Sequence, residues 1–178
     1  EISMLDTSGW EIPSADSTER ICRPPKELHG IKPVEILKVF EFDHVRMTSG
    51  VIIQDLNTKQ IRCVMKGSYE RIQQISASAS IPGDFKKITN QYASEQYYVL
   101  GLAAKELPND VDVNNLTREE AEAKLNFSGL LLFRNEIKPD SKDAIEELRL
   151  ANIRTVICTG DNGLTAVAVA RKCNMLPE

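Results

Sequence analysis

One pentapeptide, Thr159-Gly160-Asp161-Asn162-Gly163, combines a hydroxyl, a carboxylate and two glycines. We predict that it lies between a buried strand and a helix, where ligands bind in open α/β sheets and a glycine-containing turn offers free backbone N–H groups to an anion. Asp161 does not favour phosphate by itself, so a phosphate here would need Mg²⁺, a lysine or a hydrogen-bond network. The alternative is a tight turn that uses Asp-Asn-Gly for its conformational tolerance.

A second candidate, Lys66-Gly67-Ser68-Tyr69-Glu70, stands at the end of a predicted strand. A lysine in such a place, beside a glycine, can reach a phosphate or a ribose while the small residue lets the ligand approach the backbone. A surface lysine in front of a helix that starts at Gly-Ser is the alternative. Taken singly, this pentapeptide favours the surface lysine.

The third candidate is Phe42, which follows Glu41 and precedes Arg46. An aromatic ring near a cation at a strand end can stack on a nucleotide base while the cation neutralises phosphate. Phe42 as an ordinary core residue is the alternative.

Other polar residues are weaker candidates. His29 and His44 have no serine or cysteine partner at a useful spacing. Solvated faces of amphipathic helices are the expected place of five glutamates: Glu119, Glu120, Glu122, Glu146 and Glu147.

Three segments rich in strand-forming residues position the second and third candidates. They span residues 34–42, 51–54 and 61–65, with a turn over 56–59. This pattern predicts antiparallel pairing, with one face toward a core and the other open to a ligand. Around these strands we expect helices over residues 2–10, 68–75 and 85–95, the last capped by Asp84, a strand over 98–104, and a helix that begins with a Thr117–Glu120 capping box.

The pattern changes after Asn126. A continuous apolar strand is predicted over residues 127–133, a helix from Asp140 or Ser141 to Leu150, a strand over 154–158 and a helix over 164–173. This β-α-β-α order predicts a parallel sheet. We therefore expect an α+β domain, with an antiparallel sheet flanked by helices, over residues 1–126, and an incomplete Rossmann-like α/β unit over residues 127–178.

The composition limits the kinds of partner that the chain is expected to bind. The 178 residues carry a formal net charge of −4, with 22 Lys+Arg against 26 Asp+Glu and no long basic run, which argues against nucleic acid. The four cysteines lack the spacing of a metal site or a disulfide framework, so no metal ligands are assigned. No apolar run approaches the roughly 20 residues of a membrane span. The chain opens at Glu1 rather than at Met, and we expect it to be cut from a longer protein.

Taken in order, the candidates resemble the P-type ATPases. Lys66-Gly67-Ser68-Tyr69-Glu70 is similar to the Lys-Gly-Ala/Ser-Pro-Glu motif of their nucleotide-binding domain, with Tyr69 in place of proline. Thr159-Gly160-Asp161-Asn162 is similar to the Thr-Gly-Asp-Asn motif of their phosphorylation domain, and two ordered motifs are far more specific than one. Other stretches resemble the type V subfamily, in its branch of lysosomal and endosomal polyamine transporters: Cys22-Arg23-Pro24-Pro25, Phe40-Glu41-Phe42, Tyr92-Ala93-Ser94, residues 127–133 and residues 134–139.

The resemblance implies roles in nucleotide binding for the first part of the chain. Phe42 matches the aromatic that stacks on adenine, and Lys66 and Gly67 match the pair that lines the nucleotide pocket. Arg46 falls in the basic cluster beside that aromatic, and Glu1 matches an acidic residue that contacts adenine.

The resemblance implies catalytic roles for the second part. Thr159, Gly160 and Asp161 match residues that hold the transferred phosphate. Lys138 stands where many P-type pumps have the Arg of an Asp-Pro-Pro-Arg motif, and Asn135 replaces its Asp.

The sequence departs from the family at Tyr98, where the usual residue is an Arg that grips the nucleotide phosphates. One fixed charge is lost, so we expect weak ATP binding. The Asp-Lys-Thr-Gly-Thr motif with the phosphorylated Asp would precede Glu1, and the Gly-Asp-Gly-x-Asn-Asp motif that helps to hold Mg²⁺ would follow Glu178. The chain is therefore expected to bind ATP without turning it over.

The whole protein implied by this resemblance is a cation- or polyamine-transporting pump that uses ATP and Mg²⁺ and forms an aspartyl-phosphate. The chain would be a monomeric cytosolic part of a multi-pass protein of the lysosomal or late-endosomal membrane, working with the actuator, transmembrane and remaining phosphorylation domains. Two alternatives stay open: a stand-alone nucleotide-sensing module, and a phosphatase of the haloacid-dehalogenase type. The second needs an Asp nucleophile after a first strand, and no Asp-x-Asp or Asp-x-Thr has that context here.

Overall fold

A computed structural model describes residues 7–13, 18–95, 97–133, 136–159 and 163–177. By its internal contacts the chain divides into two units. The first is Glu1–Ile81 with Gly101–Gly129, and the second is Pro82–Leu100 with Leu130–Glu178. The division at Asn126 that the sequence suggests stays a prediction.

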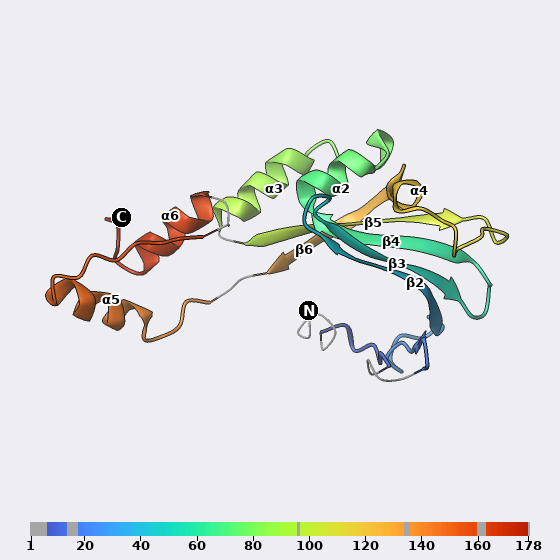
Figure 1. Ribbon diagram of the computed structural model, residues 1–178, viewed down its shortest axis with the longest axis horizontal. Coiled ribbons are helices and arrows are strands. Elements are labelled where there is room, and N and C mark those ends of the chain that lie inside the picture. Colours follow the sequence, from blue (N-terminus) through green and yellow to red (C-terminus); the bar gives the residue numbers. More distant parts are fainter. Residues whose placement is uncertain (1–6, 14–17, 96, 134–135, 160–162, 178) are drawn as a thin grey trace. The chain divides into compact units, whose positions relative to one another are not determined.

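Six strands form one sheet in which the spatial order follows the sequence order (Figure 1). The strands are β1 (Ile21–Cys22), β2 (Val34–Asp43), β3 (Thr48–Asp55), β4 (Ile61–Ser68), β5 (Tyr98–Leu107) and β6 (Asn126–Phe133). The pairs β1–β2, β2–β3 and β3–β4 are antiparallel. The helices are α2 (Tyr69–Ile75), η1 (Ser78–Ser80), α3 (Phe85–Ser94), α4 (Arg118–Glu122), α5 (Ser141–Leu150) and α6 (Gly163–Lys172). The predicted antiparallel sheet with flanking helices is confirmed.

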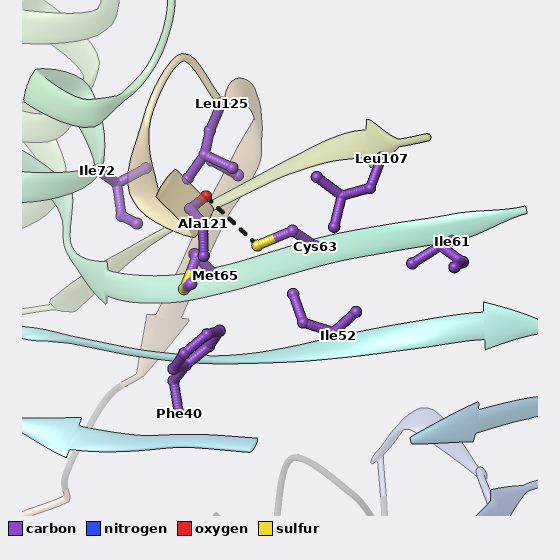
Figure 2. Packing of buried hydrophobic residues seen from close by; sticks show 10 residues of the cluster. Phe40, Ile52, Ile61, Cys63, Met65, Ile72, Leu107, Ala121 and Leu125 are labelled. Atoms are coloured by element: carbon purple, nitrogen blue, oxygen red, sulfur yellow. Dashed lines mark hydrogen bonds between the residues drawn. The ribbon is translucent and has the colours of Figure 1, made fainter. Parts of the chain in front are cut away.

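The core of the first unit lies between one face of the sheet and helices α2 and α4. Burial alternates along β4, where Ile61, Cys63 and Met65 are buried and Arg62 between them is exposed, as expected for a strand with one covered face. Figure 2 shows side chains from both helices closing over these strands. The buried cluster comprises Phe40, Ile52, Ile61, Cys63, Met65, Ile72, Ala103, Leu107, Ala121 and Leu125. Burial raises the pKa of Cys63 to about 11, so this thiol behaves as an apolar core group.

Local capping explains where two of the helices begin. Ser68 Oγ accepts a hydrogen bond from Arg71 N at 3.2 Å, so the end of β4 leads directly into α2. The predicted capping box before α4 is present, with Thr117 and Glu120 as its members. Asp84 does precede α3, but its side chain makes no capping hydrogen bond, because its backbone at φ −95° and ψ 7° is not extended.

The predicted strand over residues 154–158 is wrong, because residues 153–159 form neither a helix nor a strand. A strand needs a neighbour for its backbone N–H and C=O groups, and β6 is a member of the six-stranded sheet next to β5 instead. Helices α5 and α6 confirm the two predicted around it. The parallel Rossmann-like sheet stays a prediction.

Two further expectations, a helix over residues 2–10 and the absence of a membrane-spanning helix, can be compared only with the described residues. Of the helix predicted over residues 2–10, only residues 7–10 are described, and Thr7 and Ser8 are helical. None of the helices in the described ranges is long and apolar enough to cross a bilayer.

Candidate functional site

The residues expected to bind a nucleotide occupy one end of strands β2, β3 and β4. Asp43 pairs with Thr48, which in turn pairs with Gly67. Phe42 and Lys66 are the chain neighbours of the two outer residues in this row. Because adjacent strands are about 4.8 Å apart, the backbones of β2 and β4 lie about 10 Å apart here.

Phe42 lies in a β-bulge near the end of β2. The register between β2 and β3 shifts between Phe40 and Asp43, and such a bulge bends the strand and re-aims a side chain. The Phe42 ring is 50% exposed, and it meets the His44 ring edge-on with 5.0 Å between the centroids. The alternative of Phe42 as a core residue is therefore wrong, and Phe40 takes that place.

Lys66 and Gly67 are consecutive strand residues and so belong to opposite faces of the sheet. Gly67 is buried on the core face, where an added Cβ would lie 2.4 Å from Met47 O and 2.9 Å from Thr48 Cγ2. The close approach of the neighbouring strand thus requires a glycine at this position whether or not a ligand binds. Lys66 is half-buried on the other face, where it pairs with Ser49.

A tight turn after β2 holds Arg46 near Phe42. The Asp43 carboxylate accepts hydrogen bonds from Val45 N at 2.8 Å and Arg46 N at 2.9 Å. Hydrogen bonds from the backbone N–H groups of Arg46 and Val45 lower the pKa of Asp43. Met47, at a positive φ of 55°, closes the turn by donating its N–H to Asp43 O at 2.7 Å.

Arg46 makes its ion pairs with protein carboxylates. Its guanidinium contacts Glu119, lies 3.4 Å from Glu122 Oε2 and lies 3.8 Å from Asp43 Oδ2. The role in phosphate binding that the resemblance implies for Arg46 stays a prediction.

A buried carboxylate, Glu122, lies at the centre of these contacts. Its side chain is only 3% exposed, and it accepts hydrogen bonds from Thr48 Oγ1 at 2.7 Å, Arg118 Nε at 2.9 Å and Arg71 Nη2 at 3.2 Å. Burial by itself raises the pKa of Glu122, but the hydrogen bonds from Arg118, Thr48 and Arg71 outweigh it and hold that pKa below the ordinary glutamate value. A solvated face for Glu122 is therefore a wrong expectation.

The sequence does contain a signal for this network. Arg118 and Glu122 are four residues apart, so they lie on the same side of a helical turn. Ala121 and Leu125 beside them are apolar, and both belong to the core cluster. The apolar neighbours of this pair are therefore a local sign that Glu122 faces inward.

Two grooves of about 430 Å³ each border this network, and both are lined by Arg46, Arg71 and Gln74. Phe42 and Lys66 line neither of them. The predicted nucleotide site is therefore the exposed sheet end and not either groove.

The expected catalytic residues belong to other parts of the chain. Lys138 is exposed just before α5, and its carbonyl oxygen accepts a hydrogen bond from Ser141 N at 3.1 Å. Thr159 is exposed, and Gly160 and Asp161 lie outside the described residues. Within the described ranges, no group of three or more His, Cys, Asp and Glu residues could hold a metal ion. The catalytic roles stay predictions.

Comparison with known proteins points to the same family as the two sequence motifs. Residues 26–140 match the family described as P-type ATPase, cytoplasmic domain N. The human probable cation-transporting ATPase 13A4 is 33% identical over 189 residues, which cover 100% of this chain and 16% of that protein. The human polyamine-transporting ATPase 13A2 is 33% identical over 194 residues, covering 99% of this chain and 16% of that protein.

A third relative has the same extent of similarity. The mouse polyamine-transporting ATPase 13A3 is 33% identical over 205 residues, covering 99% of this chain and 17% of that protein. The chain thus spans about a sixth of the length of the curated relatives it matches. The family match covers well over half of the chain. The matched residues include strands β2 to β4, which bring Phe42, Lys66 and Gly67 to one end of the sheet. The chain belongs to the P-type ATPases and contains their cytoplasmic domain N.

Proposed function

We propose that the chain binds ATP at the end of strands β2 to β4. Phe42 stacks on the adenine, Lys66 neutralises phosphate, and Gly67 and Arg46 complete the surroundings of the nucleotide. The observation that supports this is the row Asp43–Thr48–Gly67, which sets an exposed aromatic and a lysine about two strand spacings apart. An apolar ring and a separate cation fit the base and the phosphates of a nucleotide.

The whole protein to which this chain belongs is proposed to be a cation- or polyamine-transporting ATPase. Its relatives are named as polyamine-transporting and cation-transporting ATPases. Residues 1–126 would bind ATP and residues 127–178 would be part of the phosphorylation domain. There Thr159, Gly160 and Asp161 would hold the transferred phosphate, and Lys138 would balance charge during phosphoryl transfer. Mg²⁺ belongs to this proposal, but the described residues supply no acidic cluster for it, so no step is assigned to it.

The chain by itself is proposed to bind ATP without hydrolysing it, as a monomeric cytosolic part of a lysosomal or late-endosomal membrane protein. Exposed apolar side chains in the second unit support the proposal that further domains of the same polypeptide pack against it. Leu150 is 75% exposed, Ile153 is 53% exposed and Val156 is 76% exposed. A run of exposed apolar groups of this kind is usually covered by another part of a protein.

Phe42→Ala and Lys66→Ala are each expected to weaken ATP binding. Loss of a stacking ring typically costs about 1 to 3 kcal/mol, so the dissociation constant should rise about 5- to 150-fold for Phe42→Ala. Loss of the lysine charge should raise it about tenfold. The measurement is an ATP titration followed by NMR chemical shifts, with thermal unfolding of each variant as a check on folding.

Two matched variants control for loss of apolar surface and of charge. Val39→Ala removes an apolar side chain that is 53% exposed on the same strand as Phe42. Lys87→Ala removes an exposed lysine from α3. Both should bind ATP as the unaltered chain does. Unchanged titration curves for Phe42→Ala and Lys66→Ala would overturn the proposed site.

Tyr98→Arg is expected to tighten ATP binding about tenfold, because it restores the charge that the family has at this position and a charge-assisted hydrogen bond is stronger than a neutral one. Tyr98 is the first residue of β5, and its side chain is 54% exposed, so the exchange disturbs no core packing. Tyr98→Gln separates the loss of the ring from the gain of charge. An equal or weaker affinity of Tyr98→Arg in the same titration contradicts the prediction.

A further inference from the structure

The bulge that presents Phe42 is bridged by one side chain from outside the strands. Arg118 Nη1 donates to Glu41 O at 2.8 Å, and Arg118 Nη2 donates to Thr48 O at 2.6 Å. These two carbonyls flank the segment of residues 42–47, one at the end of β2 and one at the start of β3. Since the β2–β3 register is interrupted between Phe40 and Asp43, Arg118 supplies backbone hydrogen bonds just where the strand pairing is irregular.

The Arg118 guanidinium is itself fixed on several sides. Its side chain is 17% exposed, and its Nε donates to Glu122 Oε1 at 2.9 Å. The guanidinium also lies 5.8 Å from the centroid of the Phe40 ring and donates to Thr48 Oγ1 at 3.0 Å. A planar fork with five donors can make these bonds together, whereas a lysine ammonium cannot span the two carbonyls in the same way.

Helix α4, which carries Arg118, is held at both ends. A helix of five residues is not stable by itself. Before it, Lys38 Nζ donates to Val113 O at 3.1 Å and Leu116 O at 2.8 Å, and the Thr117 capping box closes its first turn. After it, Lys105 Nζ donates to Ala123 O at 2.7 Å. The sheet therefore fixes the helix, and the helix fixes the bulge.

We propose that Arg118 is a positioning residue for the nucleotide site: by joining Glu41 O to Thr48 O, it holds the bulge in the form that directs Phe42 to the ligand. Arg118 acts through the backbone and does not touch the nucleotide. The inference rests on the ATP-binding function proposed above. Glu122 holds the guanidinium in place, so the buried ion pair and the exposed ring form one functional unit.

Arg118→Lys tests this inference, because it keeps the positive charge and removes the fork. We expect the dissociation constant for ATP to rise about tenfold, which corresponds to the loss of one charge-assisted hydrogen bond. Amide hydrogen exchange should become faster at Val45, Arg46 and Met47, while the amides of Ile52 and Cys63 in β3 and β4 keep their protection. Arg62→Lys is the matched control, because Arg62 is an exposed strand residue paired with Glu106.

A double-mutant cycle shows whether Arg118 acts through Phe42. In the Phe42→Ala background, Arg118→Lys should weaken ATP binding no further, because the side chain that it positions is already absent. An additional tenfold loss in that background, or an affinity of Arg118→Lys within twofold of the unaltered chain, would overturn the inference. If Arg118→Lys does not fold, Arg118→Gln, which can donate to only one of the two carbonyls, undergoes the same measurements.

The proposed function and this inference fail separately. If the unaltered chain shows no ATP-dependent chemical shifts, the proposed function fails, and the exchange rates at Val45 to Met47 still show whether Arg118 holds the bulge. If the unaltered chain binds ATP and Arg118→Lys changes neither the affinity nor those exchange rates, the inference alone is wrong.

Discussion

Replacement of Glu122 with alanine is expected to lower the free energy of unfolding by about 3 to 5 kcal/mol. Glu122 is only 3% exposed and compensates three arginines, of which Arg118 is 17% exposed. Removal of one member of a buried ion pair leaves its partners charged and desolvated, which costs far more than the pair contributes when intact. The unfolding temperature should fall by roughly 10 °C for a chain of this size. Urea unfolding followed by circular dichroism measures the free energy.

Two companion variants locate the origin of this loss. Glu122→Gln keeps the volume and can still accept from Thr48 and Arg118, so its loss should be smaller than that of the alanine variant. Glu146→Ala removes a glutamate that pairs with Arg149 on the exposed surface of α5, and it should leave the unfolding curve unchanged. A Glu122→Ala variant with a loss below about 1 kcal/mol would show that the network is not a stabilising centre.

The same carboxylate should make the stability depend on pH in the acid range. In the folded chain the pKa of Glu122 is held below the ordinary value of 4.5, which applies to the unfolded chain. At a pH between these two pKa values, the unfolded chain therefore binds more protons than the folded chain. The contribution of Glu122 is therefore complete above about pH 5 and is lost as the pH falls through the lowered pKa. Arg46, Arg71 and Arg118 face the carboxylate with positive charge, and Glu119 adds negative charge nearby. Glu122→Gln should accordingly flatten the fall of stability below pH 4.5.

Local sequence features predict most of the first unit. Segments rich in strand-forming residues predict β2 to β4, and the Thr117–Glu120 spacing predicts the beginning of α4. These signals are local, since each depends on residues only a few positions apart. The motif around Lys66 and Gly67 also predicts the strand end and the helix start that follow it.

Features that depend on distant parts of the chain were not predictable in the same way. Glu119 and Glu120 give α4 the pattern of a solvated helix. Apart from the Arg118–Glu122 spacing, the burial of Glu122 follows from arginines that lie 51 and 76 positions away in the sequence. The bulge at Phe42 likewise leaves no sign in the sequence of β2, because the register with β3 decides it. A segment with strand-forming residues, such as residues 154–158, forms a strand only where a neighbouring strand can pair with it.

Gly67→Ala is expected to lower the free energy of unfolding by about 2 to 3 kcal/mol, although it adds a single methyl group. The new Cβ would lie 2.4 Å from Met47 O, a backbone atom that also accepts the Ser68 N–H at 3.1 Å. Relief of the clash must move β3 away from β4 or break that hydrogen bond, and overpacking of this kind costs about 1 to 3 kcal/mol or more. Urea unfolding of the purified variant gives the value.

The identity of the clashing atom makes this prediction specific. Thr48→Ser removes the Cγ2 atom that lies 2.9 Å from the new Cβ but leaves Met47 O in place, so the double variant should recover little of the stability that Gly67→Ala loses. Gly83→Ala is the matched control, because an added Cβ at Gly83 has no neighbour within 4 Å, and its stability should stay within about 0.5 kcal/mol of the unaltered chain.

If Gly67→Ala is as stable as the unaltered chain but binds ATP more weakly, then the glycine serves the approach of the ligand, as the motif alone suggests. If Gly67→Ala loses both stability and affinity, and Thr48→Ser restores neither, then close packing of β3 on β4 is the reason for the glycine, and the ATP site depends on that packing.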